Sequence, residues 1–190
     1  PRDANSTRRQ PWPGLAALAL ALGLGAAPAQ VMINEILVNP PGPDLPNEFI
    51  ELRGPPNLRL TNTYLLSVEG DSSSNPGTIQ NVFDLSGRQI GGNGFLLLLQ
   101  KGSPFSLVAG ATVLIHTGSG TGWGSGPTST VGHTGEEGRT DLENGSQTFF
   151  LLRTTNPPVV GTDADTDNDG VIDSAVLATW TVLDSVGLLD

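Results

Sequence analysis

The apolar positions of this chain come in short runs rather than in long helical stripes. From residue 31 onward, runs rich in Val, Ile, Leu, Phe and Thr alternate with clusters of Gly, Pro, Asn and Ser, a pattern typical of β-strands joined by turns. We expect eight strands, at residues 31–38, 48–52, 64–69, 79–85, 95–100, 111–116, 148–153 and 179–186. No helical crossover separates them, so the pattern favours an all-β sandwich of two sheets over a parallel sheet.

Two of these runs are continuously apolar. Residues 95–99 read FLLLL and residues 149–152 read FFLL. An unbroken apolar run is typical of a strand that is covered on both faces. We therefore expect both runs in the core, and we expect residues 95–99 to form a central strand or to lie partly under a loop.

A different pattern occupies the first 29 residues. Arg8 and Arg9 precede an apolar stretch at residues 15–27, and Ala27-Pro28-Ala29 has the small residues of a cleavage site. This order is typical of a secretory signal peptide. It predicts that residues 30–190 form the mature protein, which is secreted or held at the cell surface. A membrane anchor is the alternative, but the stretch is shorter than the roughly 20 residues that span a bilayer, so we expect no transmembrane segment in the mature chain.

Length, composition and charge exclude several classes of chemistry and of binding partner. The 190 residues allow one full domain, and the absence of cysteine excludes disulfides and thiolate chemistry. The formal net charge is -10, and three of the nine basic residues lie in the leader, so the acidity belongs to the remainder of the chain. Such a surface repels phosphate backbones, and we expect no nucleic acid as a partner.

Residues 117–135 form a glycine-rich stretch, TGSGTGWGSGPTSTVGHTG. It lacks the Lys-Ser/Thr of a phosphate-binding loop, and we expect a long, mobile loop. Trp123 and His133 within it are candidates for a recognition surface, because aromatic and polar side chains in loops often carry binding. The alternative to a recognition surface is a flexible loop without a binding role.

The strongest chemical signal is the acidic run at residues 162–173, TDADTDNDGVID. Asp165, Asp167 and Asp169 take positions one, three and five of a Ca²⁺ loop, and Gly170 takes the position-six glycine. The candidate ligands are Asp163, Asp165, Asp167, Asp169, the backbone carbonyl of Val171, and Asp173. The run resembles the calcium loops of dockerin-like and thrombospondin type 3 repeats, in a single copy.

Position twelve of the loop departs from the pattern, because Val176 replaces the bidentate Glu. The loss of that ligand predicts weak binding, at roughly 10⁻⁴–10⁻³ M. Oxygen ligands without His or Cys favour Ca²⁺ over zinc or copper. The alternative is an acidic linker that is merely solvated. Glu69 and Asp71 are two residues apart and form a second, weaker candidate for a cation site.

The segment from residue 31 to residue 100 resembles a lamin-tail domain of the bacterial, secreted kind. The resemblance rests on residues 33–36 (INEI) with Asn39-Pro40, on residues 48–52 (EFIEL), and on residues 90–98 (IGGNGFLLL). It implies an immunoglobulin-like β-sandwich. It also implies an accessory role, since such domains are typically non-catalytic modules of secreted or surface proteins.

The chain shows no set of catalytic residues. His116 and His133 belong to no recognisable catalytic motif and are expected to be ordinary surface or strand-end residues. Glu48 and Glu51 are three apart on a strand and should face opposite sides. We therefore expect no enzyme, but a calcium-stabilised module that binds an unidentified protein or glycan outside the cell, or that is displayed there. The alternative is the non-catalytic N-terminal part of a larger secreted hydrolase of the nuclease or phosphatase type.

Overall fold

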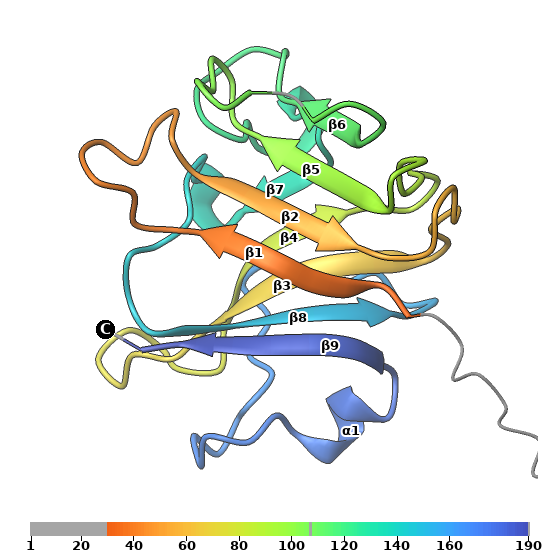
Figure 1. The fold of residues 1–190 in the computed structure, drawn as a ribbon. Coiled ribbons are helices and arrows are strands. Elements are labelled where there is room, and N and C mark those ends of the chain that lie inside the picture. Colours follow the sequence, from red (N-terminus) through yellow and green to blue (C-terminus); the bar gives the residue numbers. More distant parts are fainter. Residues whose placement is uncertain (1–29, 107, 190) are drawn as a thin grey trace, which may run out of the picture.

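The two-sheet sandwich predicted from the apolar pattern is the fold of the chain. A computed structural model describes residues 30–106 and 108–189, so the predicted leader at 1–29 lies outside the described residues. Figure 1 shows the two layers of strands. The strands are β1 (Met32–Leu37), β2 (Phe49–Arg53), β3 (Thr63–Glu69), β4 (Ile79–Asp84), β5 (Phe95–Leu99), β6 (Thr112–Ile115), β7 (His133–Gly135), β8 (Gln147–Arg153) and β9 (Thr181–Leu188).

Helices contribute little to this fold. Within residues 30–106 and 108–189 there is one short α-helix, α1 (Ser174–Leu177), and there are two 3₁₀ turns, η1 (Gly126–Thr128) and η2 (Glu136–Gly138). In the described part of the chain, no helix has the length and apolar character needed to cross a membrane.

All eight predicted strands are present within a few residues of their expected bounds. One sheet has the order β1-β2-β5-β6 and the other the order β7-β4-β3-β8-β9. Strand β5 lies between β2 and β6, and its residues from Leu96 to Leu99 are buried, which confirms its central position. The ninth strand, β7, was missed, because its three residues lie in the glycine-rich stretch and have no apolar pattern.

One strand pair departs from the antiparallel arrangement. Strands β5 and β6 are parallel, with Leu96 paired to Thr112 and Leu99 to Ile115. A parallel pair needs a long crossover connection. The described residues between Leu99 and Thr112 include no helix, so the crossover has no helical pattern that could reveal it in the sequence.

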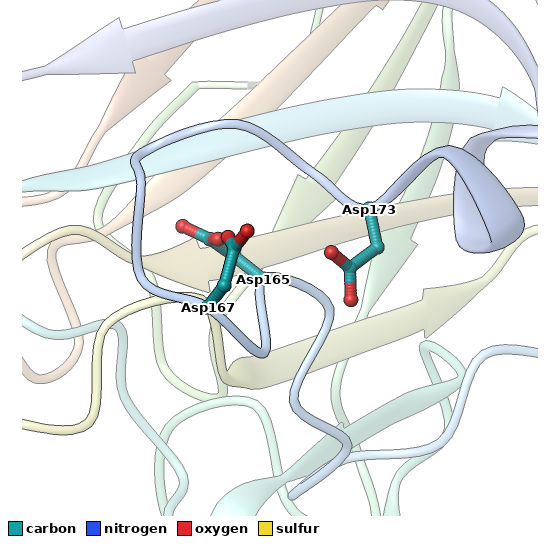
Figure 2. Close-up of side chains that lie close together, drawn as sticks. All are labelled: Asp165, Asp167 and Asp173. Atoms are coloured by element: carbon teal, nitrogen blue, oxygen red, sulfur yellow. The ribbon is translucent and has the colours of Figure 1, made fainter.

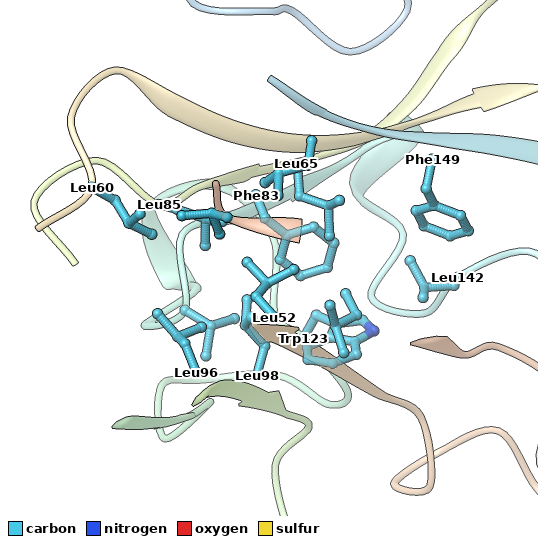
Figure 3. Close-up of a cluster of buried hydrophobic side chains, with 14 of the residues drawn as sticks. Leu52, Leu60, Leu65, Phe83, Leu85, Leu96, Leu98, Trp123, Leu142 and Phe149 are labelled. Atoms are coloured by element: carbon cyan, nitrogen blue, oxygen red, sulfur yellow. The ribbon is translucent and has the colours of Figure 1, made fainter. Parts of the chain in front are cut away.

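The main core lies between the two sheets (Figure 3). Alternate residues of each strand point into it, as the two-residue period of a strand requires. The fully buried members include Leu52 from β2, Leu65 from β3, Phe83 from β4, Leu98 from β5 and Phe149 from β8.

A second apolar cluster covers the outer face of the five-stranded sheet. Strands β3, β4 and β8 contribute the other face of the same alternation, including Leu66, Val82 and Leu152. The segment between β8 and β9 packs on this face. It contributes Val160, Ala164, Ile172, Val176 and Trp180. The acidic loop is therefore part of a segment that is held by its own apolar residues.

The glycine-rich stretch does not form the predicted recognition surface. Trp123 and His133 are both 0% exposed, and His116 is 1% exposed, so the expectation of an exposed aromatic is wrong. The two histidines are buried strand-end residues and not surface residues, because His133 begins β7 and His116 directly follows β6. The Trp123 ring packs edge to face on Phe83, with 5.2 Å between the centroids. Gly124 makes this packing feasible, because its φ is +62° and a Cβ there would lie 2.6 Å from His116 Cε1.

Candidate functional site

The acidic run forms a closed loop on the outer face of the five-stranded sheet. At its start, the N–H of Ile79 in β4 donates to the carbonyl of Thr162, and the N–H of Ala164 donates to the carbonyl of Gly77. At its end, the N–H of Asp173 donates to the carbonyl of Ala164 at 2.8 Å. The loop is therefore anchored to the sheet and closed on itself just before α1.

Three carboxylates converge inside this loop. One oxygen each from Asp165, Asp167 and Asp173 can be chosen so that all three lie within 4.8 Å of one another. Figure 2 shows Asp165 and Asp167 side by side, with Asp173 facing them across the loop. Asp165 is 3% exposed, whereas Asp167 is exposed and Asp173 is half-buried. The structure thus brings together three of the six predicted ligands, at positions one, three and nine.

Asp165 also organises the loop backbone. Its Oδ1 accepts the N–H of Asp169 at 3.2 Å, and its Oδ2 accepts the N–H of Gly170 at 2.9 Å. This wrapping requires a sharp turn, and Gly170 supplies it with a φ of +83°. No atom lies within 4 Å of the position that a Gly170 Cβ would take. The glycine is therefore needed for its backbone conformation and not for space.

Asp163 and Asp169, two further predicted ligands, are not among the three convergent carboxylates. The Asp169 carboxylate accepts the N–H of Val171 at 2.8 Å, and that of Asp163 accepts the N–H of Asp165 at 3.0 Å. These two carboxylates make local turns with the backbone. Val171, whose backbone carbonyl is the remaining candidate, is 60% exposed. Their role as ligands stays a prediction.

The cluster has an excess of negative charge. No ion pair joins its carboxylates to any lysine, arginine or histidine within residues 30–106 and 108–189. Repulsion from the Asp169 carboxylate raises the pKa of Asp167 above its usual range. The N–H and hydroxyl of Thr166 donate to Asp173 at 3.2 and 2.8 Å but bring no positive charge. Crowded carboxylates of this kind are stabilised by a cation.

The departure at position twelve has a structural cause. Val176, which replaces the Glu of the pattern, packs with Ile172 and Trp180 against the outer face of the sheet. Val176 therefore contributes to the second apolar cluster and not to a ligand shell. The site consequently offers fewer protein oxygens than a full loop would.

A pocket of about 280 Å³ lies next to the loop. Its lining includes Asp165, Gly170 and Ile172 from the loop and Val68 and Phe150 from the outer face of the sheet. An ion in the loop would therefore sit beside a partly apolar hollow.

The second candidate cation site is not assembled. Glu69 accepts the N–H of Asp71 at 2.7 Å and the side-chain amide of Gln80 at 2.7 Å, so its two oxygens already have donors. The Asp71 carboxylate instead accepts the N–H of Ser146 at 3.3 Å. In the described part of the chain, the trio in the acidic loop is the one group of three such side chains with ligand atoms close enough to share an ion.

A second cluster, centred on Glu48, was not foreseen from the sequence. Glu48, the residue before β2, and Glu51 within β2 face opposite sides, as predicted: Glu48 points into the core, and Glu51 accepts a hydrogen bond from Asn34 on the surface. Glu48 is 0% exposed. Its donors come from Gln100, Trp123 and Leu142. They are 52 to 94 residues away, so no local spacing could have predicted them.

No protein-family model, no curated protein and no solved structure matches this chain.

Proposed function

We propose that the chain is a secreted, non-catalytic β-sandwich module that Ca²⁺ stabilises and that binds a protein or glycan outside the cell. The observation that carries the proposal is the convergence of Asp165, Asp167 and Asp173 within one loop. That loop belongs to the segment that covers the outer face of the five-stranded sheet. An ion bound there would hold this segment closed and so act on stability.

Calcium is the cation that this donor set favours. The cluster offers carboxylate oxygens without nitrogen or sulfur ligands, which suits a hard cation. Ca²⁺ accepts six to eight oxygens in flexible geometry, whereas Mg²⁺ demands a near-ideal octahedron. Water would complete the shell where Val176 replaces the bidentate Glu, and we expect affinity in the range of about 10⁻⁴–10⁻³ M.

The sheet order supports the lamin-tail resemblance. The three pieces that carry it lie on β1, on β2 and the residue before it, and on β5 with its preceding turn. These strands are neighbours in the order β1-β2-β5. Pieces that are far apart in sequence thus form one continuous patch of sheet. An immunoglobulin-like sandwich and an accessory role are what this resemblance implies, and they are part of the proposal.

The placement of the histidines favours a binding module over an enzyme. His133 is buried, with Nδ1 2.6 Å from the carbonyl of Gly124 and Nε2 2.9 Å from the carboxamide of Asn81. Burial lowers the pKa of His133 to about 4. A neutral ring donates one hydrogen bond, either to the carbonyl of Gly124 or to the carboxamide of Asn81. Its enclosure suits packing rather than proton transfer to a substrate.

Thermal melts in calcium and in chelator test the calcium proposal. At a Kd of about 10⁻³ M, 10 mM Ca²⁺ should stabilise the fold by about 1.4 kcal/mol, which corresponds to a rise in Tm of about 3–6 °C. Asp167→Asn should abolish most of that rise and leave the Tm in chelator unchanged or slightly higher. The matched control is Glu35→Gln, an exposed carboxylate on β1, which should keep the full rise. If Asp167→Asn lowers the Tm equally in calcium and in chelator, the proposal fails.

A further inference from the structure

One side of the sandwich is open, and it lies between strands β1 and β9. In the described part of the chain, β1 is an end strand of the four-stranded sheet and β9 is an end strand of the five-stranded sheet. The two strands contact each other and run in the same direction (Figure 1). The N–H of Ile33 donates to Asp184 Oδ2 across the gap at 2.8 Å, but no strand pairing between β1 and β9 is present among the described residues. Each strand therefore has one row of main-chain N–H and C=O groups that faces no partner strand.

Two pockets form a continuous groove along this gap, the β1–β9 groove. The first has a volume of about 270 Å³ and is lined by residues 33–36, Asp184, Ser185, Val186 and Leu188. The second has a volume of about 280 Å³ and is lined by residues 36–39, Asn144, Gly145, Leu188 and Leu189. They share Ile36 and Leu188. On its β1 side the groove extends from Ile33 to Asn39, which is roughly 20 Å of extended chain.

Strand β9 has the features of an edge that accepts another strand. It is eight residues long, five of them are exposed, and it contains neither Lys nor Pro, the residues that commonly protect the edges of sheets. Val186 is 36% exposed and contributes an apolar side chain to the groove. The exposed length of β9 is thus open to main-chain pairing with an added strand.

The other end of the four-stranded sheet is covered in a way that the β9 edge is not. There the glycine-rich stretch lies against the end of β6. Thr130 Oγ1 donates to the carbonyl of Ile115 at 3.3 Å and accepts the N–H of Thr117 at 2.9 Å. The chain therefore covers one side of the sandwich with its own residues and leaves the opposite side accessible.

The charge of the groove indicates which occupant it favours. Its lining includes two carboxylates, Glu35 and Asp184, and no Lys, Arg or His. Neither carboxylate forms an ion pair within residues 30–106 and 108–189, and Glu35 lies opposite a third carboxylate, Glu51. A second copy of the chain would bring the same carboxylates and a formal net charge of -10, so self-pairing is disfavoured. A basic segment would compensate these charges.

We propose that the β1–β9 groove binds an extended, basic segment of a partner protein. The segment would add its main chain to the unpaired edge of β9 and direct Lys or Arg side chains toward Glu35 and Asp184, with its apolar side chains on Val186. This inference rests on the proposed binding role and narrows the partner to a protein. It does not rest on the calcium site, because the groove shares no lining residue with the acidic loop at 162–173.

A defined peptide tests the proposal. The probe is an acetylated and amidated peptide of about seven residues, the length of the groove, which alternates lysine and valine. It is titrated into the full chain in chelator at low salt, and the amide NMR signals are followed. We expect saturable shifts that are largest at residues 33–36 and 184–188, and none with a peptide that has glutamate in place of lysine. No saturable shift up to roughly 1 mM peptide, or shifts centred on another surface, would overturn the proposal.

Methylation of the peptide nitrogens separates main-chain pairing from attraction between charges. A strand presents the N–H groups of alternate residues to each of its two sides. One peptide is therefore methylated on its valine nitrogens and another on its lysine nitrogens, and both keep the full charge. Pairing with one edge predicts that one of the two binds at least about ten-fold more weakly than the other. Equal binding by both and by the unmethylated peptide would show that the main chain is not paired and would overturn the proposal.

Charge reversal at Glu35 tests the location of the site. Glu35→Lys should weaken binding of the lysine peptide at least about five-fold and allow the glutamate peptide to bind. The variant should fold, because Glu35 lies opposite Glu51 and the lysine replaces a like-charge pair with an opposite-charge pair. The matched control is Glu137→Lys, an exposed carboxylate in η2 beside β7 at the far end of the five-stranded sheet, which should keep the affinity. Equal weakening by both variants would reduce binding to attraction by net charge and would contradict the proposed site.

Sedimentation of the chain without peptide tests the competing occupant, a second copy. We expect a monomer. Dimerisation that shifts the same amide signals would assign this edge to a second copy and would overturn the proposal. The calcium experiments remain separate: an absence of calcium binding with intact peptide binding contradicts the calcium site alone, and the reverse result contradicts the groove alone.

Discussion

Glu48 and Asp165 are both buried carboxyls, and a buried carboxyl needs hydrogen bonds, a proton or a cation to compensate its negative charge. The surroundings of the two residues provide this compensation in different ways. Glu48 and Asp165 are 0% and 3% exposed, and both accept backbone N–H groups. Glu48 shares its hydrogen-bond cluster with neutral groups and can hold a proton, so neutral donors suffice. Asp165 has the carboxylates of Asp167 and Asp173 within 4.8 Å, and one proton cannot relieve three crowded charges. The first environment favours a hydrogen-bonded acid and the second favours a divalent cation.

The largest effect in this comparison should come from removing the Glu48 carboxyl. Glu48→Ala leaves three buried donors without an acceptor, at about 1–3 kcal/mol each. We expect a loss of more than about 3 kcal/mol in the free energy of unfolding, measured by urea denaturation at pH 6. Glu51→Ala, on the outward side of β2, should cost less than about 1 kcal/mol. Similar losses for the two variants would show that the hydrogen bonds of Glu48 contribute no more to the free energy of unfolding than a surface carboxylate does.

The pH dependence of stability should separate the buried acid from the buried base. Between pH 4.5 and 6.5 the unfolded chain carries a charged histidine and an ionised glutamate, whereas the folded chain holds His133 neutral and Glu48 protonated. Both states then bind one proton at this pair, and the contribution of the pair is flat.

Outside that window the two groups destabilise the fold in turn. As the pH rises from 6.5 to about 8, the folded chain alone keeps its proton, on Glu48, and stability should fall by about 1.4 kcal/mol per pH unit. Below pH 4.5 the unfolded chain holds both protons, and stability should fall again until His133 is protonated near pH 4. Urea denaturation across this range should show the alkaline decline in the wild type and not in Glu48→Gln. Parallel declines in the two proteins would contradict the assignment.

The smallest effect concerns the glycine of the acidic loop, and a second glycine provides a matched control. Gly170 and Gly87 have φ values of +83° and +81°, and at both positions an added Cβ would have no atom within 4 Å. Each Gly→Ala variant should therefore cost about 1 kcal/mol of backbone strain. Only Gly170→Ala should also reduce the rise in Tm with calcium, because the Gly170 N–H bonds to Asp165. Equal calcium responses in the two variants would mean that the turn does not shape an ion site.

The parts of this molecule that local patterns encode were predictable, and the long-range parts were not. Short runs rich in Val, Ile, Leu, Phe and Thr, set between clusters of Gly, Pro, Asn and Ser, located eight strands. Likewise, the spacing of Asp165, Asp167 and Asp173 placed them in one loop, because a turn of fixed geometry depends on near neighbours. Trp123 and His133 were misassigned to a surface, since their burial depends on partners such as Glu48 and Asn81 elsewhere in the chain. No spacing rule relates residues joined only by the tertiary fold.

Calorimetric titration of Ca²⁺ into the wild-type protein and Asp167→Asn measures most directly whether the acidic loop is an ion site. Saturable binding of about one ion per chain, with a Kd near 10⁻⁴–10⁻³ M and clear weakening in Asp167→Asn, is the expected result. An absence of saturable heat up to several millimolar Ca²⁺, or equal binding by both proteins, would contradict it and reduce residues 163–173 to a solvated acidic loop.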